Sequence, residues 1–247
     1  MEYLNLETME GMSAEAFQSQ RPYPWVNIPA TLTAQGFERL CETLPDVSTF
    51  IPKIGHTRAY GQGSHDRCIL HYLPGVEVAD PWQEFIAELN GKSYDDFLRR
   101  MFGLPRRKHL IFTMEWYYAW QGCCVTPHCD AARKLATHIF YFNTKADWKD
   151  DWGGDILILD DDGRCKAHSG PSFEELRTTA TLDPRENRSL LFKRTAHSWH
   201  GVRPLRAPPG QLRKLFIITV NVPTWQVIFR RLRGKDPDGY SLKGKAA

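Results

Sequence analysis

The chain has 247 residues, a formal net charge of +3, 42% hydrophobic residues and 25% charged residues. These values are ordinary for a soluble globular protein with one sizeable core, and the charge is too small to indicate nucleic-acid binding. No run of about 18 apolar residues is present, so we expect no membrane span. The acidic N-terminus does not resemble a secretory signal. The six cysteines form no CxxC pair, which favours reduced thiols in a cytoplasmic protein.

The first 105 residues predict a helix-rich region. A strand is expected at 23–28, followed by a helix that Thr31 or Thr33 caps and that Pro45 ends. Residues 46–66 have the composition of a loop. After it we expect a strand at 67–73, a helix from an Asp80 cap to about residue 90, and a helix at 93–102.

After Pro105 the pattern changes to short apolar runs separated by turn residues. Such a series favours a β-sandwich or jelly roll. We therefore expect a helix-rich support region at 1–105, a β-rich catalytic core at 106–223 and a basic C-terminal tail at 224–247, all within one structural domain. The predicted strands lie at 108–120, 137–143, 156–159, 187–192 and 214–222, with a hairpin-type turn at 160–163.

His128 and Asp130 are the first candidate metal ligands. Residues two apart on a strand point to the same side, about 6.5–7 Å apart along the chain. Cys129, between them, would face the opposite side. A distant histidine would complete the set, with His200 as the best candidate and His197 as its competitor. Two histidines and one carboxylate on one face of a metal suit non-haem Fe(II) that binds a co-substrate and oxygen.

Residues from about 112 to 222 resemble the prolyl-4-hydroxylase-like branch of the 2-oxoglutarate- and Fe(II)-dependent dioxygenases. The His-x-Asp pair alone is a weak signal, but the ordered series of motifs is specific. The series consists of Tyr118, His128-x-Asp130, the strand at 139–143, Asp147-Trp148, Gly153-Gly154, the strand at 187–192, His200-Gly-Val202 and Arg213.

The resemblance implies a mostly β fold, a double-stranded β-helix (a distorted jelly roll) flanked by N-terminal α-helices. It implies that His128, Asp130 and His200 hold Fe(II), with 2-oxoglutarate and O2 as co-substrates. It also implies that Arg213 pairs with the distal carboxylate of 2-oxoglutarate, which fits the rigid fork of guanidinium donors. Tyr141 matches a position that helps to hold this carboxylate, and Tyr118 matches a position near the keto-acid end.

Two further features of the sequence concern the alternatives to Arg213 and to His200. The spacing of 13 residues from His200 to Arg213 is longer than is usual in this branch, so Arg203, Arg206 and Lys214 are alternatives for the co-substrate. Lys214 would face the other side of its strand. The family places a Val two residues after the distal ligand, which fits His200 and not His197.

The resemblance implies hydroxylation of an unactivated C–H bond, with release of succinate and CO2. A small molecule (an amino acid, a sugar or a natural-product intermediate) is favoured as substrate because no extended peptide groove can be read. Hydroxylation of peptidyl proline or another protein side chain is the alternative. A metal-dependent hydrolase or isomerase and a ligand sensor are alternatives of other classes. Arg58, Arg67 and Arg194 are expected to be surface charges rather than substrate groups, and the sequence leaves the oligomeric state open.

Overall fold

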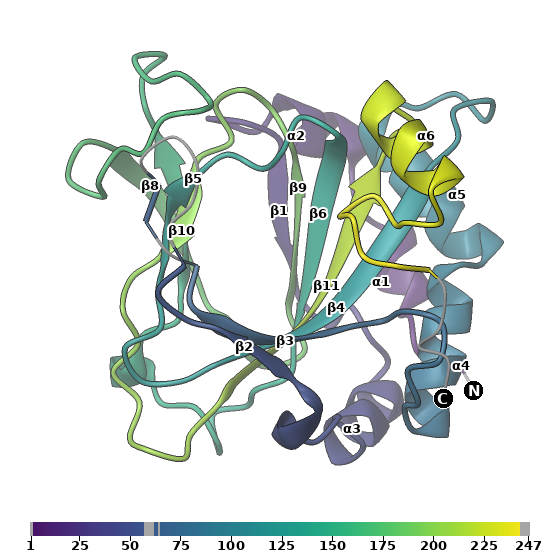
Figure 1. Cartoon of the computed structure of the whole chain (residues 1–247), viewed down its shortest axis with the longest axis horizontal. Coiled ribbons are helices and arrows are strands. Elements are labelled where there is room, and N and C mark those ends of the chain that lie inside the picture. Colours follow the sequence, from purple (N-terminus) through teal and green to yellow (C-terminus); the bar gives the residue numbers. More distant parts are fainter. Residues whose placement is uncertain (1, 57–61, 64, 243–247) are drawn as a thin grey trace.

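The structure is a computed structural model that describes residues 2–56, 62–63 and 65–242. Figure 1 shows a larger sheet through the centre, a smaller sheet on the left and helices on the right. The α-helices are α1 (Leu6–Glu10), α2 (Ala14–Ser19), α3 (Ala34–Glu42), α4 (Asp80–Leu89), α5 (Lys92–Phe102) and α6 (Trp225–Leu232), and the 3-10 helices are η1 (Val47–Thr49) and η3 (Asp150–Trp152).

The strands form two antiparallel sheets. The larger sheet has the order β1-β9-β6-β11-β4-β3-β2, and the smaller has the order β5-β10-β7-β8. This arrangement is the expected mostly β jelly roll with flanking helices. The strands are β1 (Trp25–Ile28), β2 (Ile51–Lys53), β3 (Arg67–His71), β4 (Ile111–Ala119), β5 (Val125–His128), β6 (Lys134–Tyr141), β7 (Ile156–Asp160), β8 (Arg177–Leu182), β9 (Ser189–Lys193), β10 (His200–Val202) and β11 (Arg213–Asn221).

The two faces of the larger sheet bury different cores. On the outer face, Trp82 of α4 packs against Trp116 and Phe216, with ring centroids 5.1 Å and 5.2 Å away. Tyr117 and Leu215, the neighbours of these strand residues, belong to the core between the two sheets. Because successive strand residues point to opposite faces, the central strands hold the helices on one side and line the interior on the other.

The N-terminal region contributes more to the sheet than its sequence suggests. β1 pairs with β9, and β2 and β3 extend the opposite edge beyond β4. β2 lies within the segment expected to be a loop, so that expectation is wrong for Ile51–Lys53. With three residues, β2 is too short to show a recognisable alternation of apolar and polar residues, and its extended conformation is determined by pairing with β3.

One of the two expected helix N-caps is present in the structure, and the other is not. The Thr33 side chain accepts a hydrogen bond from the Gly36 backbone N–H at 3.1 Å, which confirms Thr33 as the cap of α3. Asp80 is already inside α4, and the cap is Ala79, which makes no side-chain capping bond. The carboxylate of Asp80 therefore adds only favourable charge to the first turn of α4.

Two further expectations are corrected. Asp162 and Gly163 do have positive φ angles of 48° and 73°, but the antiparallel partner β8 begins only at Arg177, so a long connection rather than this short turn joins β7 to β8. The C-terminal segment is not a loose tail, because Trp225–Leu232 form α6, capped by Thr224. The six cysteines are all free thiols. In the described part of the chain, no helix has the length and apolar character needed to cross a membrane.

Candidate metal centre and co-substrate site

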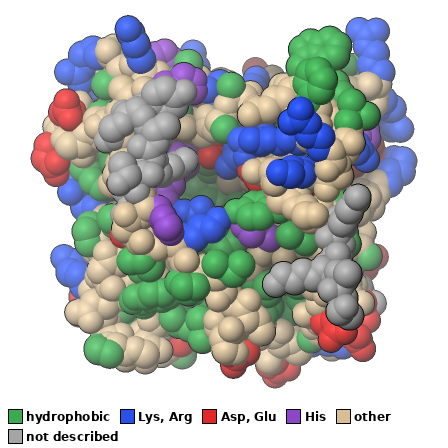
Figure 2. Space-filling model, viewed as in Figure 1, with side chains coloured by type: hydrophobic (Ala, Val, Ile, Leu, Met, Phe, Trp, Pro, Cys, Tyr) green, Lys and Arg blue, Asp and Glu red, His purple; other side chains and the backbone are tan. Residues whose placement is uncertain are grey.

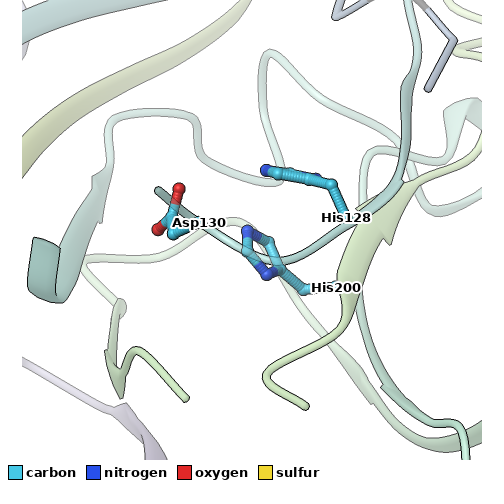
Figure 3. Close-up of side chains that lie close together, drawn as sticks. All are labelled: His128, Asp130 and His200. Atoms are coloured by element: carbon cyan, nitrogen blue, oxygen red, sulfur yellow. The ribbon is translucent and has the colours of Figure 1, made fainter. Parts of the chain in front are cut away.

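His128, Asp130 and His200 come together in the smaller sheet. His128 ends β5, and His200 begins β10 directly opposite it in the strand register. Asp130 follows His128 by two residues. One ligand atom from each of the three side chains lies within 4.8 Å of the others. Figure 3 shows the two rings and the carboxylate directed toward a common space. Among the described residues, this is the one such group of three or more.

Backbone carbonyls orient both imidazole rings. His128 Nδ1 lies 3.1 Å from the Thr126 carbonyl oxygen, and His200 Nδ1 lies 2.9 Å from the Ser198 carbonyl oxygen. A carbonyl only accepts, so each Nδ1 donates and carries the ring proton. Each Nε2 is then left with a lone pair for a metal.

Asp130 is held as a carboxylate. Thr137 Oγ1 donates to one of its oxygens at 2.7 Å, and Lys134 Nζ donates to the other at 2.8 Å. Burial alone would raise the pKa of Asp130, but the Lys134 ammonium, His200 and the two hydrogen bonds hold it well below its usual range. The group is therefore negatively charged at neutral pH, which suits a divalent cation.

The competing candidates lie elsewhere. His197 has a side chain that is 47% exposed, and it pairs with Asp161 at 3.0 Å rather than with the three residues. The Cys129 thiol donates to the Ala196 carbonyl at 3.5 Å. His138 is buried between Tyr94 and Ser189 and forms a hydrogen bond with each. None of these three side chains therefore belongs to the metal group.

Arg213 lies at the buried side of the same cavity, which has a volume of about 150 Å³ and also includes the three metal-site residues. Its side chain is 2% exposed, yet its Nε and Nη2 atoms have no hydrogen-bond partner. The buried Tyr141 hydroxyl also has none, and the Tyr141 ring centroid is 6.0 Å from the guanidinium carbon. Buried donors without acceptors are costly. A carboxylate is the acceptor that fits a guanidinium fork beside a hydroxyl.

The three alternatives to Arg213 are engaged outside this cavity. Arg203 pairs with Glu174, and Arg206 Nε donates to the Asp151 carbonyl. Lys214 pairs with Asp147 on the opposite face of β11, as strand alternation predicts.

Tyr118 does not reach the cavity. Its hydroxyl donates to the Pro45 carbonyl at 3.0 Å, and its ring stacks on Phe50 at 4.2 Å in the core beneath the helices. Its neighbour Tyr117 lines the cavity instead. The structure therefore does not bring Tyr118 to the proposed co-substrate site, and the residue that lines the cavity is the one before it. The position of one residue along a strand decides which face its side chain occupies.

The mouth of the cavity is bordered by charged and polar side chains. Figure 2 shows a hollow near the centre of this face, with Lys, Arg and His side chains around it. His65, Arg67, Glu115 and Lys134 are among the lining residues. Arg67, expected to be a surface charge, is therefore part of the cavity. No sequence pattern indicates this position for Arg67, because β3 is brought to the site only by pairing with β4.

Residues 114–221 match the model of the family described as the 2OG-Fe(II) oxygenase superfamily. The match spans the strands that carry His128, Asp130, His200 and Arg213. The chain contains a 2OG-Fe(II) oxygenase domain. It is an enzyme of the 2-oxoglutarate-dependent, non-haem iron dioxygenase class, as the sequence predicts. A search of curated proteins found no match.

Solved structures similar to this oxygenase share its fold at low sequence identity. A prolyl-4-hydroxylase from Pseudomonas putida is 16% identical, with a TM-score of 0.58 over 86% of this chain and 100% of that one. A Trichoplax adhaerens prolyl hydroxylase, in complex with a hypoxia inducible factor peptide fragment, is 16% identical, with a TM-score of 0.60 over 88% and 90% of the chains. The alpha ketoglutarate dependent epimerase SnoN from nogalamycin biosynthesis is 14% identical, with a TM-score of 0.55 over 97% and 93%.

The cofactor set of the oxygenase family is Fe(II), 2-oxoglutarate and O2, in agreement with the sequence prediction. The residues present fit these groups. Two imidazoles and one carboxylate suit Fe(II) with open positions, and the unpaired donors of Arg213 and Tyr141 suit a carboxylate. The metal-dependent hydrolase and the ligand sensor are therefore set aside.

Proposed function

We propose that this oxygenase hydroxylates an unactivated C–H bond of a small molecule, with release of succinate and CO2. The observation that carries the proposal is one cavity with a three-residue metal group and a buried, unpaired guanidinium. His128, Asp130 and His200 would hold Fe(II), and Arg213 would hold the distal carboxylate of 2-oxoglutarate. When bound, Fe(II) with 2-oxoglutarate and oxygen supplies the oxidising chemistry.

The protein's own contribution is binding, orientation and exclusion of water. Carbonyl groups fix the two histidine rings, and Thr137 and Lys134 fix the Asp130 carboxylate. The Tyr141 hydroxyl would donate to the same carboxylate as Arg213. Apolar side chains, Val125, Ile139 and Leu215, line the cavity between the charged groups and keep it poor in water.

The expected division of the chain fits this proposal in outline. Residues 106–223 supply all of the proposed ligands, and residues 1–105 supply the covering helices and the edge strands. Residues 224–247 remain outside the proposed chemistry, and a cytoplasmic location stays a prediction.

Hydroxylation of a protein side chain is the second candidate. Two of the similar structures described above are prolyl hydroxylases, one of them in complex with a peptide fragment. At 16% identity they support the shared fold and leave the substrate open. A small molecule is favoured by the charged mouth of the cavity, in which basic groups outnumber acidic ones.

The first experiment tests the cofactor site. Apo protein is mixed anaerobically with Fe(II) and 2-oxoglutarate, and the visible charge-transfer band of an iron-chelated keto acid is measured. We expect the band in the parent protein, its loss in His128→Ala, and a weaker 2-oxoglutarate affinity in Arg213→Ala.

His197→Ala is the matched control, because His197 lies outside the three-residue group. It should retain the band with unchanged affinity. Absence of the band in a parent protein that binds Fe(II) tightly would exclude the proposed co-substrate site. A band that persists in His128→Ala would exclude the proposed ligand set.

A further inference from the structure

Arg67 is a guanidinium of the cavity mouth that lies near the carboxylate of Glu115 without forming an ion pair with it. Its Nη1 donates to the His65 carbonyl at 2.6 Å, and its guanidinium carbon lies 5.7 Å from the centroid of the Tyr117 ring. Its Nε is buried and has no hydrogen-bond partner. Among the described residues, no carboxylate forms an ion pair with it. The Arg67 side chain is thus held in place and still has N–H groups that can donate hydrogen bonds to a ligand.

The other charged groups of the cavity already have partners or roles. Lys134 pairs with Asp130 at 2.8 Å, and Glu115 accepts a hydrogen bond from His71 at 3.1 Å. Arg213 serves the proposed 2-oxoglutarate site. Three Lys and Arg side chains line the cavity in the described part of the chain, and Arg67 is the one of these three that is left for a further ligand.

The charge balance of the loaded site favours an anion. Fe(II) and the 2-oxoglutarate dianion cancel each other. The cavity then retains three cationic side chains (Arg67, Lys134 and Arg213) against two carboxylates (Asp130 and Glu115). An anionic group compensates this excess, and a neutral or cationic one does not. Charges that are partly buried in a cavity are screened less by salt than charges on the open surface.

Arg67 is also placed next to the metal group. His65, whose carbonyl anchors Arg67, has its ring centroid 4.0 Å from that of His128. His65 also forms an isolated bridge with Val125 at the start of β5. A group bound at Arg67 would therefore sit beside the histidine side of the metal site, while Arg213 holds the co-substrate.

We propose that Arg67 binds the anionic group of the substrate, a carboxylate or a phosphate on a small molecule. This inference rests on the proposed function and narrows its substrate class. The planar fork of a guanidinium matches both kinds of oxyanion in two parallel hydrogen bonds. With its anion fixed at Arg67, a neighbouring carbon of the substrate is presented to the metal, as positioning requires.

The test measures binding without turnover. Protein loaded with Zn(II) and saturating 2-oxoglutarate is melted in the presence of paired compounds: free amino acids and their methyl esters, short carboxylic acids and their amides, sugar phosphates and the free sugars. We expect at least one carboxylate or phosphate to raise the melting temperature, while its neutral partner does not. The pair that responds distinguishes the two kinds of anion.

Three variants assign the effect to Arg67. Arg67→Gln should weaken the affinity for the responding anion at least tenfold. Arg67→Lys keeps the positive charge but loses the forked guanidinium, so its affinity for the anion should lie between that of the parent and that of Arg67→Gln. Arg107→Gln, an exposed arginine outside the cavity, is the control and should match the parent. All variants should bind 2-oxoglutarate with the parent's affinity.

Three results would overturn the inference. They are a panel in which no anion binds more tightly than its neutral partner, a response that Arg67→Gln leaves unchanged, and an equal loss in Arg107→Gln. Each leaves the proposed function standing if the Fe(II) and 2-oxoglutarate band is present. Failure of the proposed function would instead appear as loss of 2-oxoglutarate binding in the parent protein.

Discussion

Gly154 lies directly against Arg213. A Cβ atom added at Gly154 would be 3.0 Å from both Cδ and Nε of the arginine, closer than side chains normally pack. Gly154 also has a φ of +94°, a conformation that L-residues rarely adopt. The absence of a side chain at Gly154 therefore makes room for the Arg213 side chain at the buried side of the cavity.

Gly154→Ala should displace Arg213 and weaken the binding of 2-oxoglutarate. We expect KM for 2-oxoglutarate to rise by about tenfold or more, since a shift of about 1 Å in a positioning group has effects of this size. Steady-state succinate release at varied 2-oxoglutarate measures it. Gly153→Ala is the matched control, because its φ is +73° but no atom lies within 4 Å of the added Cβ. Equal effects of the two substitutions would show that backbone strain, rather than the contact with Arg213, is responsible.

Tyr141→Phe should weaken 2-oxoglutarate binding without unfolding the protein. The hydroxyl is buried without a partner, so its loss removes no hydrogen bond from the unliganded protein. A bond to a charged carboxylate is worth about 1.5–3 kcal/mol, and we expect the dissociation constant to rise about 10- to 100-fold. Calorimetric titration with 2-oxoglutarate measures this.

Tyr118→Phe is the counterpart of that substitution at a tyrosine of β4 whose side chain lies outside the cavity. It removes the bond to the Pro45 carbonyl and should lower stability by about 1 kcal/mol. Affinity for 2-oxoglutarate should not change. A loss of affinity in Tyr118→Phe, with none in Tyr141→Phe, would reverse the assignment made from the structure.

Thr137→Val should weaken metal binding. It keeps the shape of the side chain but removes the donor to Asp130 at 2.7 Å. Partners of metal ligands typically contribute about 10- to 100-fold to metal affinity, and titration with Mn(II) measures the change. Thr219→Val is the control: Thr219 is the register partner of Thr137 on β11 and lines the same cavity, but no hydrogen bond joins it to Asp130. If both substitutions weaken binding alike, the bond to Asp130 is not the cause.

His138 should make the protein less stable as the pH falls below 6.5. Burial lowers the pKa of His138 from 6.5 to about 3. Between these values the unfolded chain binds a proton that the folded protein does not. The free energy of unfolding therefore rises with pH across this window, by about 1.4 kcal/mol per unit from this residue. Urea unfolding of the parent and His138→Gln from pH 7 to 5 isolates the contribution as a difference in slope.

A direct titration provides the check on His138. The NMR signals of its ring should show no transition above about pH 4. A transition near pH 6.5 in the folded protein would contradict the prediction. The hydrogen bonds to Tyr94 and Ser189, at 2.9 Å and 2.8 Å, hold the neutral ring in place.

The sequence by itself predicted the class of the fold and the three residues that the structure brings together as a candidate metal group. His128 and Asp130 are only two residues apart in the chain, so a short-range pattern is enough to mark them as a pair, although β5 ends at His128 and Asp130 follows the strand. The ordered motifs around them indicated His200, Arg213 and the jelly roll. These features are local in the chain or recur in a fixed order, and a linear pattern is enough to show them.

Tertiary structure alone decided which of two adjacent residues enters the cavity and which distant charges meet there. Tyr117 and Tyr118 are adjacent residues of the same type. Only the pairing of β4 with β11 and β3 directs Tyr117 into the cavity and Tyr118 toward the helices. Arg67 reaches the metal site because β3 joins the edge of the larger sheet, about 60 residues before His128 in the chain. Contacts between residues so far apart depend on strand order and register, which no periodicity within one strand encodes.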